Sequence, residues 1–261
     1  MRATLKSPFP MRLVPRAFQS ARLFLCALCA LCGFSKAAEL NATNFLAQAE
    51  SAYRAAQAAY ATNTQNVSAA IDLARTAFDN ADLAKTDDQR ETLANIGIAA
   101  TRNASALNTN SVDAHYYLAL NLGQLARTKM LGALKILTEM EQALKRALAL
   151  DPKFDYAGGH RTIGVLYLEA PGWPTSVGNK NKARAHLTQA LALAPEFPDN
   201  HHCYLEALAK WREWAALHEK IAAYHALLPA AKTNFTGPEW DYEWFDWTRR
   251  FKEIQTKAKK P

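Results

Sequence analysis

Apolar residues recur along most of the chain at spacings of three and four, and alanine fills many of the positions between them. This periodicity places an apolar stripe on each of a series of helices, and no stretch alternates between apolar and polar residues as a half-buried strand does. The pattern predicts helices over residues 43–61, 67–84 and 87–107, then helix pairs over 113–127 with 131–150, 156–169 with 179–194, and 199–211 with 213–228. With a closing helix near the C-terminus, we expect an all-α protein of about ten helices.

A turn signature repeats at a fixed interval within this helical region. Ala-Leu-Ala-Leu-Asp-Pro begins at Ala147, Ala-Leu-Ala-Leu-Ala-Pro begins 43 residues later at Ala190, and a related segment begins 43 residues upstream at Ala104. The apolar residues of such a signature close one helix, the proline stops it, and the next helix follows a short turn. Three copies at one period predict a helical-repeat protein.

The middle helix pair resembles the tetratricopeptide family at eight positions. Its first helix has residues where the family has Trp, Leu, Gly and Tyr, and its second has residues where the family has Ala, Phe, Ala and Pro; they are His160, Ile163, Gly164 and Tyr167, then Ala183, Leu187, Ala190 and Pro195. The small residues let two helices approach closely. The departure is length, since the family repeats every 34 residues. Seven of the additional residues fall in the loop 170–179, which proline and glycine keep from being helical.

The closing segment carries an aromatic stripe. Thr236 and Glu239 have the spacing of a capping box, and the helix expected after them places its large aromatic residues one turn apart at Trp240, Trp244, Trp247 and Phe251. A stripe of this size needs burial. We interpret the segment 237–261 as a helix that caps the last repeat; the alternative is an aromatic face that binds a partner.

The first 37 residues have the composition of an export signal. They contain six basic residues and no acidic one, with an apolar run over 23–34 and small residues at Ser35 and Ala37. We expect a signal peptide over 1–37, cleaved near Ala37, with Met11 as an alternative start. The mature chain, 38–261, is expected to form a single periplasmic helical-repeat domain of N-terminal helices (38–112), helix pairs (113–236) and a capping helix (237–261). A leucine precedes each of Cys26, Cys29 and Cys32, so a lipid anchor is not expected.

Removal of the leader changes the charge and cysteine content. The whole chain has a formal net charge of +7, but without the six basic residues of the leader it has 25 basic and 24 acidic residues. The basic balance therefore gives no support to nucleic-acid binding. Cys203 is the one cysteine left, so the mature chain has no internal disulfide.

Two phrases narrow the resemblance to a particular family. They are residues 115–124, beginning at His115, and the run Gly158-Gly-His-Arg161 followed by Gly164, Pro171, Gly178 and Ala183. Together they are similar to the TatT proteins, which are exported helical-repeat partners of TRAP transporters. The resemblance implies a periplasmic protein that can self-associate and that works with a substrate-binding protein in solute uptake. A generic exported adaptor is the alternative, because other exported repeat proteins share these phrases.

No set of residues indicates an enzyme, a cofactor or a metal site. His201, His202 and Cys203 are adjacent, but adjacent residues on a helix point about 100° apart, and no second pair of ligands stands at metal spacing. We therefore expect function to reside in binding.

A second stripe on the first helix of each pair would line the concave side of a repeat stack. We favour ordinary core packing for this stripe, and the alternative is an apolar groove for an amphiphilic ligand or a peptide carboxylate. Arg161 would then bind the carboxylate, unless it pairs with an acidic residue such as Glu139 or Asp155. Trp173, held between prolines in the inserted loop, would anchor a partner protein. The candidate binding residues are His115, His160, Arg161, Trp173, His201, Tyr204 and Trp211.

Overall fold

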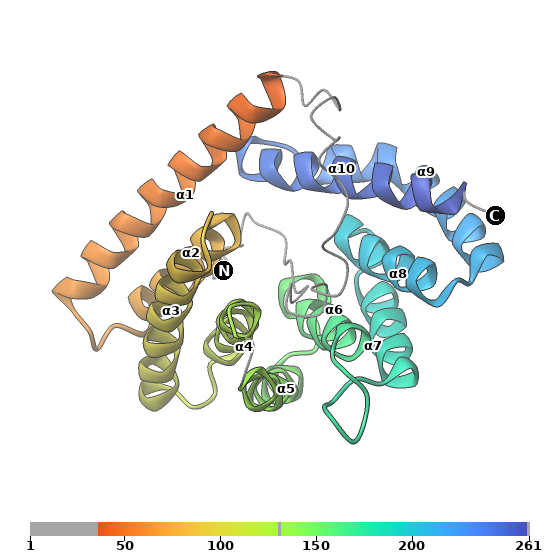
Figure 1. Cartoon of the computed structure of the whole chain (residues 1–261). Helices are drawn as coiled ribbons and strands as arrows, with labels where there is room; N and C mark the ends of the chain where they lie inside the picture. The colour runs from red at the N-terminus through yellow and green to blue at the C-terminus, as the bar shows by residue number, and fades with distance from the viewer. Residues whose placement is uncertain (1–35, 130–131, 260–261) are drawn as a thin grey trace. The chain divides into compact units, whose positions relative to one another are not determined.

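The fold is described by a computed structural model, which covers residues 36–129 and 132–259 (Figure 1). Residues 1–35 of the predicted leader (1–37) lie outside these residues, and Lys36 and Ala37 are the first two residues of α1. The helices are α1 (Lys36–Thr62), α2 (Val67–Leu83), α3 (Asp87–Leu107), α4 (Val112–Arg127), α5 (Ala133–Leu150), α6 (Phe154–Glu169), α7 (Lys180–Leu193), α8 (Pro198–Trp211), α9 (Trp214–Asn234) and α10 (Asp241–Ala258). A 3₁₀ turn, η2 (Pro238–Trp240), precedes the last. The prediction of an all-α fold is confirmed.

Polar side chains fix the starts of several helices close to the predicted residues. Asn66, Thr86, Ser111 and Asn179 each accept a hydrogen bond from the backbone N–H three residues later. Each bond satisfies one of the amides that a helix leaves free at its first turn. The helix expected near Asp87 therefore begins there with Thr86 as its cap.

Two expectations for the C-terminal part were wrong. The sequence placed the end of α9 at residue 228, but the helix continues through Pro229 to Asn234. Proline removes a helical hydrogen bond, yet the added turn buries Ala231 completely in an aromatic cluster, and tertiary packing decides the outcome. The capping box at Thr236 is replaced by η2, and α10 begins at Asp241 without a side-chain cap.

The described chain divides into two compact units, with the boundary inside α5, between Met140 and Glu141. No pattern in composition or spacing indicated this boundary within the expected single domain. In the N-terminal unit α2 and α3 form a hairpin, α4 packs against both, and α1 packs against α2. In the C-terminal unit α6 and α7 form a hairpin, α8 packs against both, α9 pairs with α8, and α10 covers α8 and α9.

Buried asparagines join a helix to an earlier helix of the same unit. Asn80 Nδ2 donates to Ala49 O at 2.6 Å, and Asn121 Nδ2 donates to Ala74 O at 3.0 Å. In the C-terminal unit Asn200 Nδ2 donates to Tyr156 O at 3.0 Å. A buried amide group needs hydrogen-bond partners. These contacts therefore fix how the joined helices are aligned against each other.

The hairpin of α6 and α7 has the tetratricopeptide-like packing that the sequence indicated. A Cβ on Gly164 would lie 2.8 Å from the Leu187 side chain, and Ala183, Leu187 and Ala190 are all completely buried. Glycine at the crossing therefore brings the two helices into close contact. The chain is an all-α protein of tetratricopeptide-like helical hairpins with a C-terminal capping helix.

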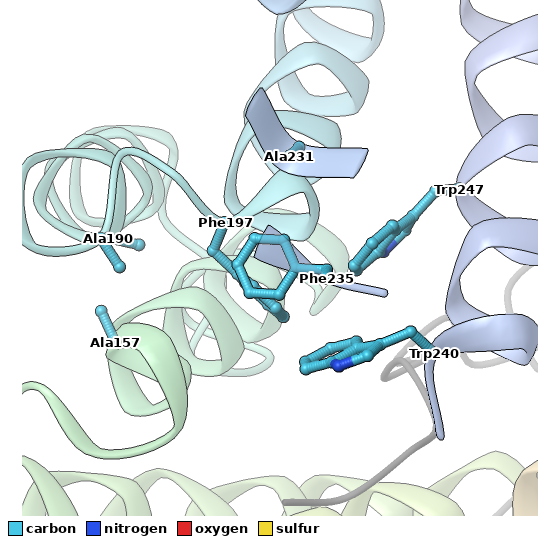
Figure 2. Close-up of a cluster of buried hydrophobic side chains, with 8 residues drawn as sticks. Ala157, Ala190, Phe197, Ala231, Phe235, Trp240 and Trp247 are labelled. Carbon is cyan, nitrogen blue, oxygen red and sulfur yellow. The ribbon is translucent and has the colours of Figure 1, made fainter. Parts of the chain in front are cut away.

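The aromatic stripe of the closing segment packs into the C-terminal unit. Trp247 is completely buried, and Trp240 lies beside it at a ring-centroid distance of 6.1 Å. Figure 2 shows both indoles converging on Phe197 and Phe235. The interpretation of this segment as a cap is confirmed, and the partner-binding alternative is wrong because the aromatic face is used internally.

Candidate functional site

Arg161, a candidate for binding a ligand carboxylate, is paired inside the C-terminal unit. Its side chain is 4% exposed. The guanidinium forms ion pairs with Asp155 at 3.0 Å and with Asp199 at 3.1 Å, and it donates to Asn200 Oδ1 at 3.0 Å. It also lies 5.0 Å from the centre of the Phe197 ring. The alternative in which Asp155 pairs with Arg161 is confirmed, and Glu139 pairs with Arg102 in the other unit.

The backbone at the start of α6 explains why an arginine is needed there. Asp155, Tyr156 and Ala157 have positive φ angles of 49°, 53° and 62°, a conformation that costs roughly 1–2 kcal/mol per residue for non-glycine residues. It turns carbonyl groups toward the Arg161 guanidinium, which donates to Asp155 O and Tyr156 O. Arg161 thus stabilises a strained turn that begins the helix.

The ion pairs continue from Arg161 into α10. Asp199 is 2% exposed and also accepts from Arg250, whose guanidinium pairs with Glu206 at 2.8 Å. Burial opposes the charged form of Arg250, but Glu206 and Asp199 outweigh it and hold its pKa well above the usual value. One aspartate therefore bridges two buried arginines and ties the capping helix to the hairpin before it.

His115 and His201 have the same structural role in different units. Each lies near the start of a hairpin's first helix and contacts a carbonyl six residues upstream: Nε2 of His115 lies 3.0 Å from Thr109 O, and Nε2 of His201 lies 2.7 Å from Pro195 O. Burial is the main cause that lowers the pKa of His201. Each imidazole therefore closes the loop that precedes its helix.

His160 forms a close pair with His186 of α7. Their Nδ1 atoms are 2.9 Å apart, so one ring donates a proton to the other. Burial, followed by the neighbouring His160, Lys145 and Lys182, lowers the pKa of His186 to about 4. Burial also lowers the pKa of His160. The pair is therefore held neutral at ordinary pH.

Tyr204 and Trp211, candidates from the same stripe, pack against the core. Both contact a core cluster of Leu187, Cys203 and Ala207. Trp211 is also covered by cations of α7, with the Arg184 guanidinium 4.4 Å and the Lys180 ammonium 5.3 Å from its ring. Core packing, the interpretation favoured for this stripe, is what the C-terminal unit contains.

Trp173 differs from every other candidate because its indole is 88% exposed. The loop that carries it has a fixed base: Gly178 N donates to Pro171 O at 2.8 Å and Asn179 N donates to Tyr167 O at 2.9 Å. A Cβ on Gly178 would lie 2.0 Å from Ala170 O, so glycine lets the two ends of the loop meet. The hydrogen bonds at the base order the loop (170–179, here called the Trp173 loop) while its tip faces solvent.

Sequence reasoning missed a groove in the N-terminal unit. It has a volume of about 650 Å³ and lies among α1, α2 and the start of α3. Its lining combines apolar side chains with charged ones, among them Leu46, Tyr53, Leu83, Glu50 and Arg54. Such a lining suits an amphiphilic molecule. The one sequence feature that could have predicted this groove is the apolar stripe of α1, which contains more alanine than large apolar residues.

Metal and membrane chemistry find no support in the described part of the chain. Residues 36–129 and 132–259 contain no cluster of three histidine, cysteine or carboxylate side chains suited to a metal ion. His202 is instead completely buried, with its Nε2 atom 2.7 Å from the Tyr224 hydroxyl. Within the same residues no helix has the length and apolar character that a bilayer crossing requires.

Comparisons with known proteins give a match to a family model and a similarity to solved structures. Residues 34–162 match the family model described as "Regulator of microtubule dynamics protein 1-3". The crystal structure of MamA protein is similar with a TM-score of 0.44 and 17% sequence identity, over 74% of this chain and 91% of that one. No curated protein matches the chain. The family match ends before the Trp173 loop, so it covers α1 to α5 and the first part of α6.

Proposed function

We propose that this protein is an exported scaffold that binds a partner protein through the Trp173 loop. In this proposal it serves as an accessory of a TRAP-type solute uptake system, as the resemblance of residues 115–124 and 158–183 to TatT proteins implies. Stacked helical hairpins commonly present surfaces for other proteins. The partner would be a solute-binding protein of that system, and the TatT resemblance also implies self-association.

The observation that carries the proposal is the exposure of Trp173 on an ordered loop. Large aromatic side chains are normally buried on folding, and all the other tryptophans in the described chain are at least partly buried. Tryptophan is also among the residues that contribute most to protein interfaces. A loop ordered before binding loses little conformational entropy when a partner arrives. The Trp173 indole is therefore held in place by an ordered loop but is not needed for packing within the fold, so it is available as an aromatic anchor for a partner.

Export is part of the proposal and rests on the leader. A basic segment, an apolar run of twelve residues and small residues at 35 and 37 are the parts of a signal peptide. N-terminal sequencing of the protein from its own cells should give a chain beginning at Ala38. A chain that retains the leader, or one lipidated at Cys26, Cys29 or Cys32, would contradict this part of the proposal.

The alternative is a generic adaptor that joins other proteins without a transporter. The family matched by residues 34–162 favours it, because its description concerns regulation of another protein assembly. Under this alternative the Trp173 loop would still bind, but its partner would not belong to a solute uptake system. Co-sedimentation of the mature chain with purified microtubules tests the specific form that the family description suggests.

The test is quantitative capture from the native envelope. The tagged mature chain and its Trp173→Ala variant are each cross-linked in place and recovered, and the bound proteins are measured by mass spectrometry. We expect a TRAP solute-binding subunit to be enriched, and its recovery to fall by about tenfold or more with Trp173→Ala. Lys252→Glu, an exposed change on α10, is the control.

Each result assigns the function differently. Loss of other envelope proteins, with no solute-binding subunit among them, would favour the adaptor. Equal recovery of every partner by the two chains would show that the Trp173 loop is not the docking site.

A further inference from the structure

The surface around the Trp173 loop has a pronounced charge asymmetry. From residue 170 to residue 195 the chain contains Lys180, Lys182 and Arg184 and no acidic residue. Glu213 is the carboxylate that pairs with two of them, with Lys180 at 3.0 Å and Arg184 at 2.6 Å. No ion pair among the described residues includes Lys182. The loop and the helix after it therefore keep an excess of positive charge.

Lys182 contacts Tyr167, the residue whose carbonyl holds the end of the Trp173 loop. Its ammonium group lies 5.2 Å from the centre of the Tyr167 ring, and the Tyr167 carbonyl accepts the hydrogen bond from Asn179 N at the end of the loop. The Tyr167 hydroxyl donates to Glu141 at 2.6 Å, and Glu141 pairs with Lys145 at 2.7 Å. Both lysines are therefore linked to the Tyr167 side chain, Lys182 over its ring and Lys145 through Glu141.

The positive charge of these two lysines affects the pKa of the neighbouring His186. Both Lys145 and Lys182 contribute to lowering the pKa of His186, after burial and His160. The Lys145 side chain is 57% exposed, and Lys182 is exposed as well. Positive charge placed in the first turns of a helix also works against the helix dipole. The cations of α7 therefore weaken the helix that carries them, which is typical of residues kept for binding.

We propose that the Trp173 loop and the lysine pair Lys145 and Lys182 dock an acidic segment of a partner protein that carries an apolar side chain. The apolar side chain of this segment covers the Trp173 indole, and the carboxylates of the segment pair with the two lysines. This proposal rests on the proposed function, since it names the chemistry of the partner at the same loop. A protein is favoured over a lipid surface because a single exposed indole offers little apolar area to insert into a bilayer.

The experiment begins with an unbiased probe. A displayed library of random 12-residue peptides is selected on the mature chain and depleted on its Trp173→Ala variant. We expect the surviving peptides to be rich in Asp and Glu and to share an aliphatic or aromatic residue. Survivors that are neutral or basic, or a selection that yields no peptide dependent on Trp173, would overturn the proposal.

Binding of the best peptide is then measured by calorimetry on matched variants. Trp173→Ala should weaken binding by about tenfold or more, whereas Lys182→Glu should weaken it severalfold and reduce its dependence on salt. Lys252→Glu on α10 makes the same charge change outside the proposed docking surface, and this variant should bind like the parent chain. Equal weakening by Lys182→Glu and Lys252→Glu would mean that only net charge matters, which would contradict the proposal.

Two further arms separate the sources of failure. Vesicles of anionic phosphatidylglycerol should bind the chain no better than neutral vesicles; Trp173-dependent binding to anionic vesicles would replace the protein partner with a membrane. If native partner capture depends on Trp173 while no acidic peptide is selected, the acidic chemistry is wrong and the proposed function stands. If native capture is independent of Trp173, the proposed function itself fails.

Discussion

Arg161 and Trp173 lie on the same hairpin, yet the structure uses them in opposite ways. Arg161 is almost completely buried and its charge is met by two aspartates, whereas Trp173 is almost completely exposed and contacts solvent. The charged residue is inside and the apolar residue is outside. The comparison shows that residue type alone does not identify a binding site, because the burial of each side chain decides which one is free to bind.

The largest effect should come from removing the aspartate that bridges the two arginines. Asp199→Ala leaves Arg161 and Arg250 without their shared counter-ion in a buried setting. We expect the free energy of unfolding, measured by urea denaturation, to fall by about 3–5 kcal/mol.

An exposed ion pair in the same unit provides the control for Asp199→Ala. Glu219 pairs with its neighbour Lys220 at the surface of α9, and Glu219→Ala should change stability by about 0.5 kcal/mol or less. Similar losses for Asp199→Ala and Glu219→Ala would mean that the buried network contributes no more than a surface pair.

Two tryptophans of the C-terminal unit allow a buried and an exposed residue of the same type to be compared. Trp247 is completely buried and Trp173 is 88% exposed. Trp247→Ala should destabilise the protein by about 3–5 kcal/mol because it empties the core beneath α10. Trp173→Ala should change stability by about 0.5 kcal/mol or less. A large stability loss for Trp173→Ala would return the loop to the scaffold.

The histidine pair of α6 and α7 should make stability depend on pH. The folded pKa of His186 is depressed to about 4, below the unfolded value of about 6.5. The unfolded state therefore binds more protons between these values, so stability falls as pH decreases from about 6.5 to about 4. After allowance for solvent screening we expect a loss of about 1–2 kcal/mol from this group.

The measurement is the free energy of unfolding at several pH values for the parent chain and for His186→Gln. The substituted chain should show a shallower decline, because glutamine does not titrate. His160, Lys145 and Lys182 are the groups that influence His186, and they stay in place in this variant. Parallel pH profiles for the two chains would mean that His186 is not held neutral by the fold.

Helix periodicity predicted most of the fold because it depends on neighbours along the chain. Gly164, Ala183 and Ala190 have small side chains at the spacing of a helix crossing, and they pack where that spacing requires. The error at Pro229 has the opposite cause. A local rule ends the helix there, and burial of Ala231 against distant aromatic rings overrides it.

The candidate site was less predictable because partners distant in sequence decide it. The sequence shows that Arg161 needs a counter-charge, and Asp155 was a candidate for it, but Asp199 lies 38 residues further along the chain. The strained turn at 155–157 and the His160 contact with His186 likewise have no signature in composition or spacing. Trp173 was recognisable because prolines and glycine around it exclude a helix.

The central claim is that the Trp173 loop binds while the Arg161 network holds the fold. The most direct test places Arg161→Lys and Trp173→Ala side by side in thermal melting and in partner capture. We predict that Arg161→Lys lowers the melting temperature by about 5 °C or more, because one ammonium group does not reproduce the bonds of a guanidinium. Trp173→Ala should melt like the parent chain and lose its partner. The reverse pattern, with Trp173→Ala unstable or with partner loss caused by a stable Arg161→Lys chain, would contradict the account.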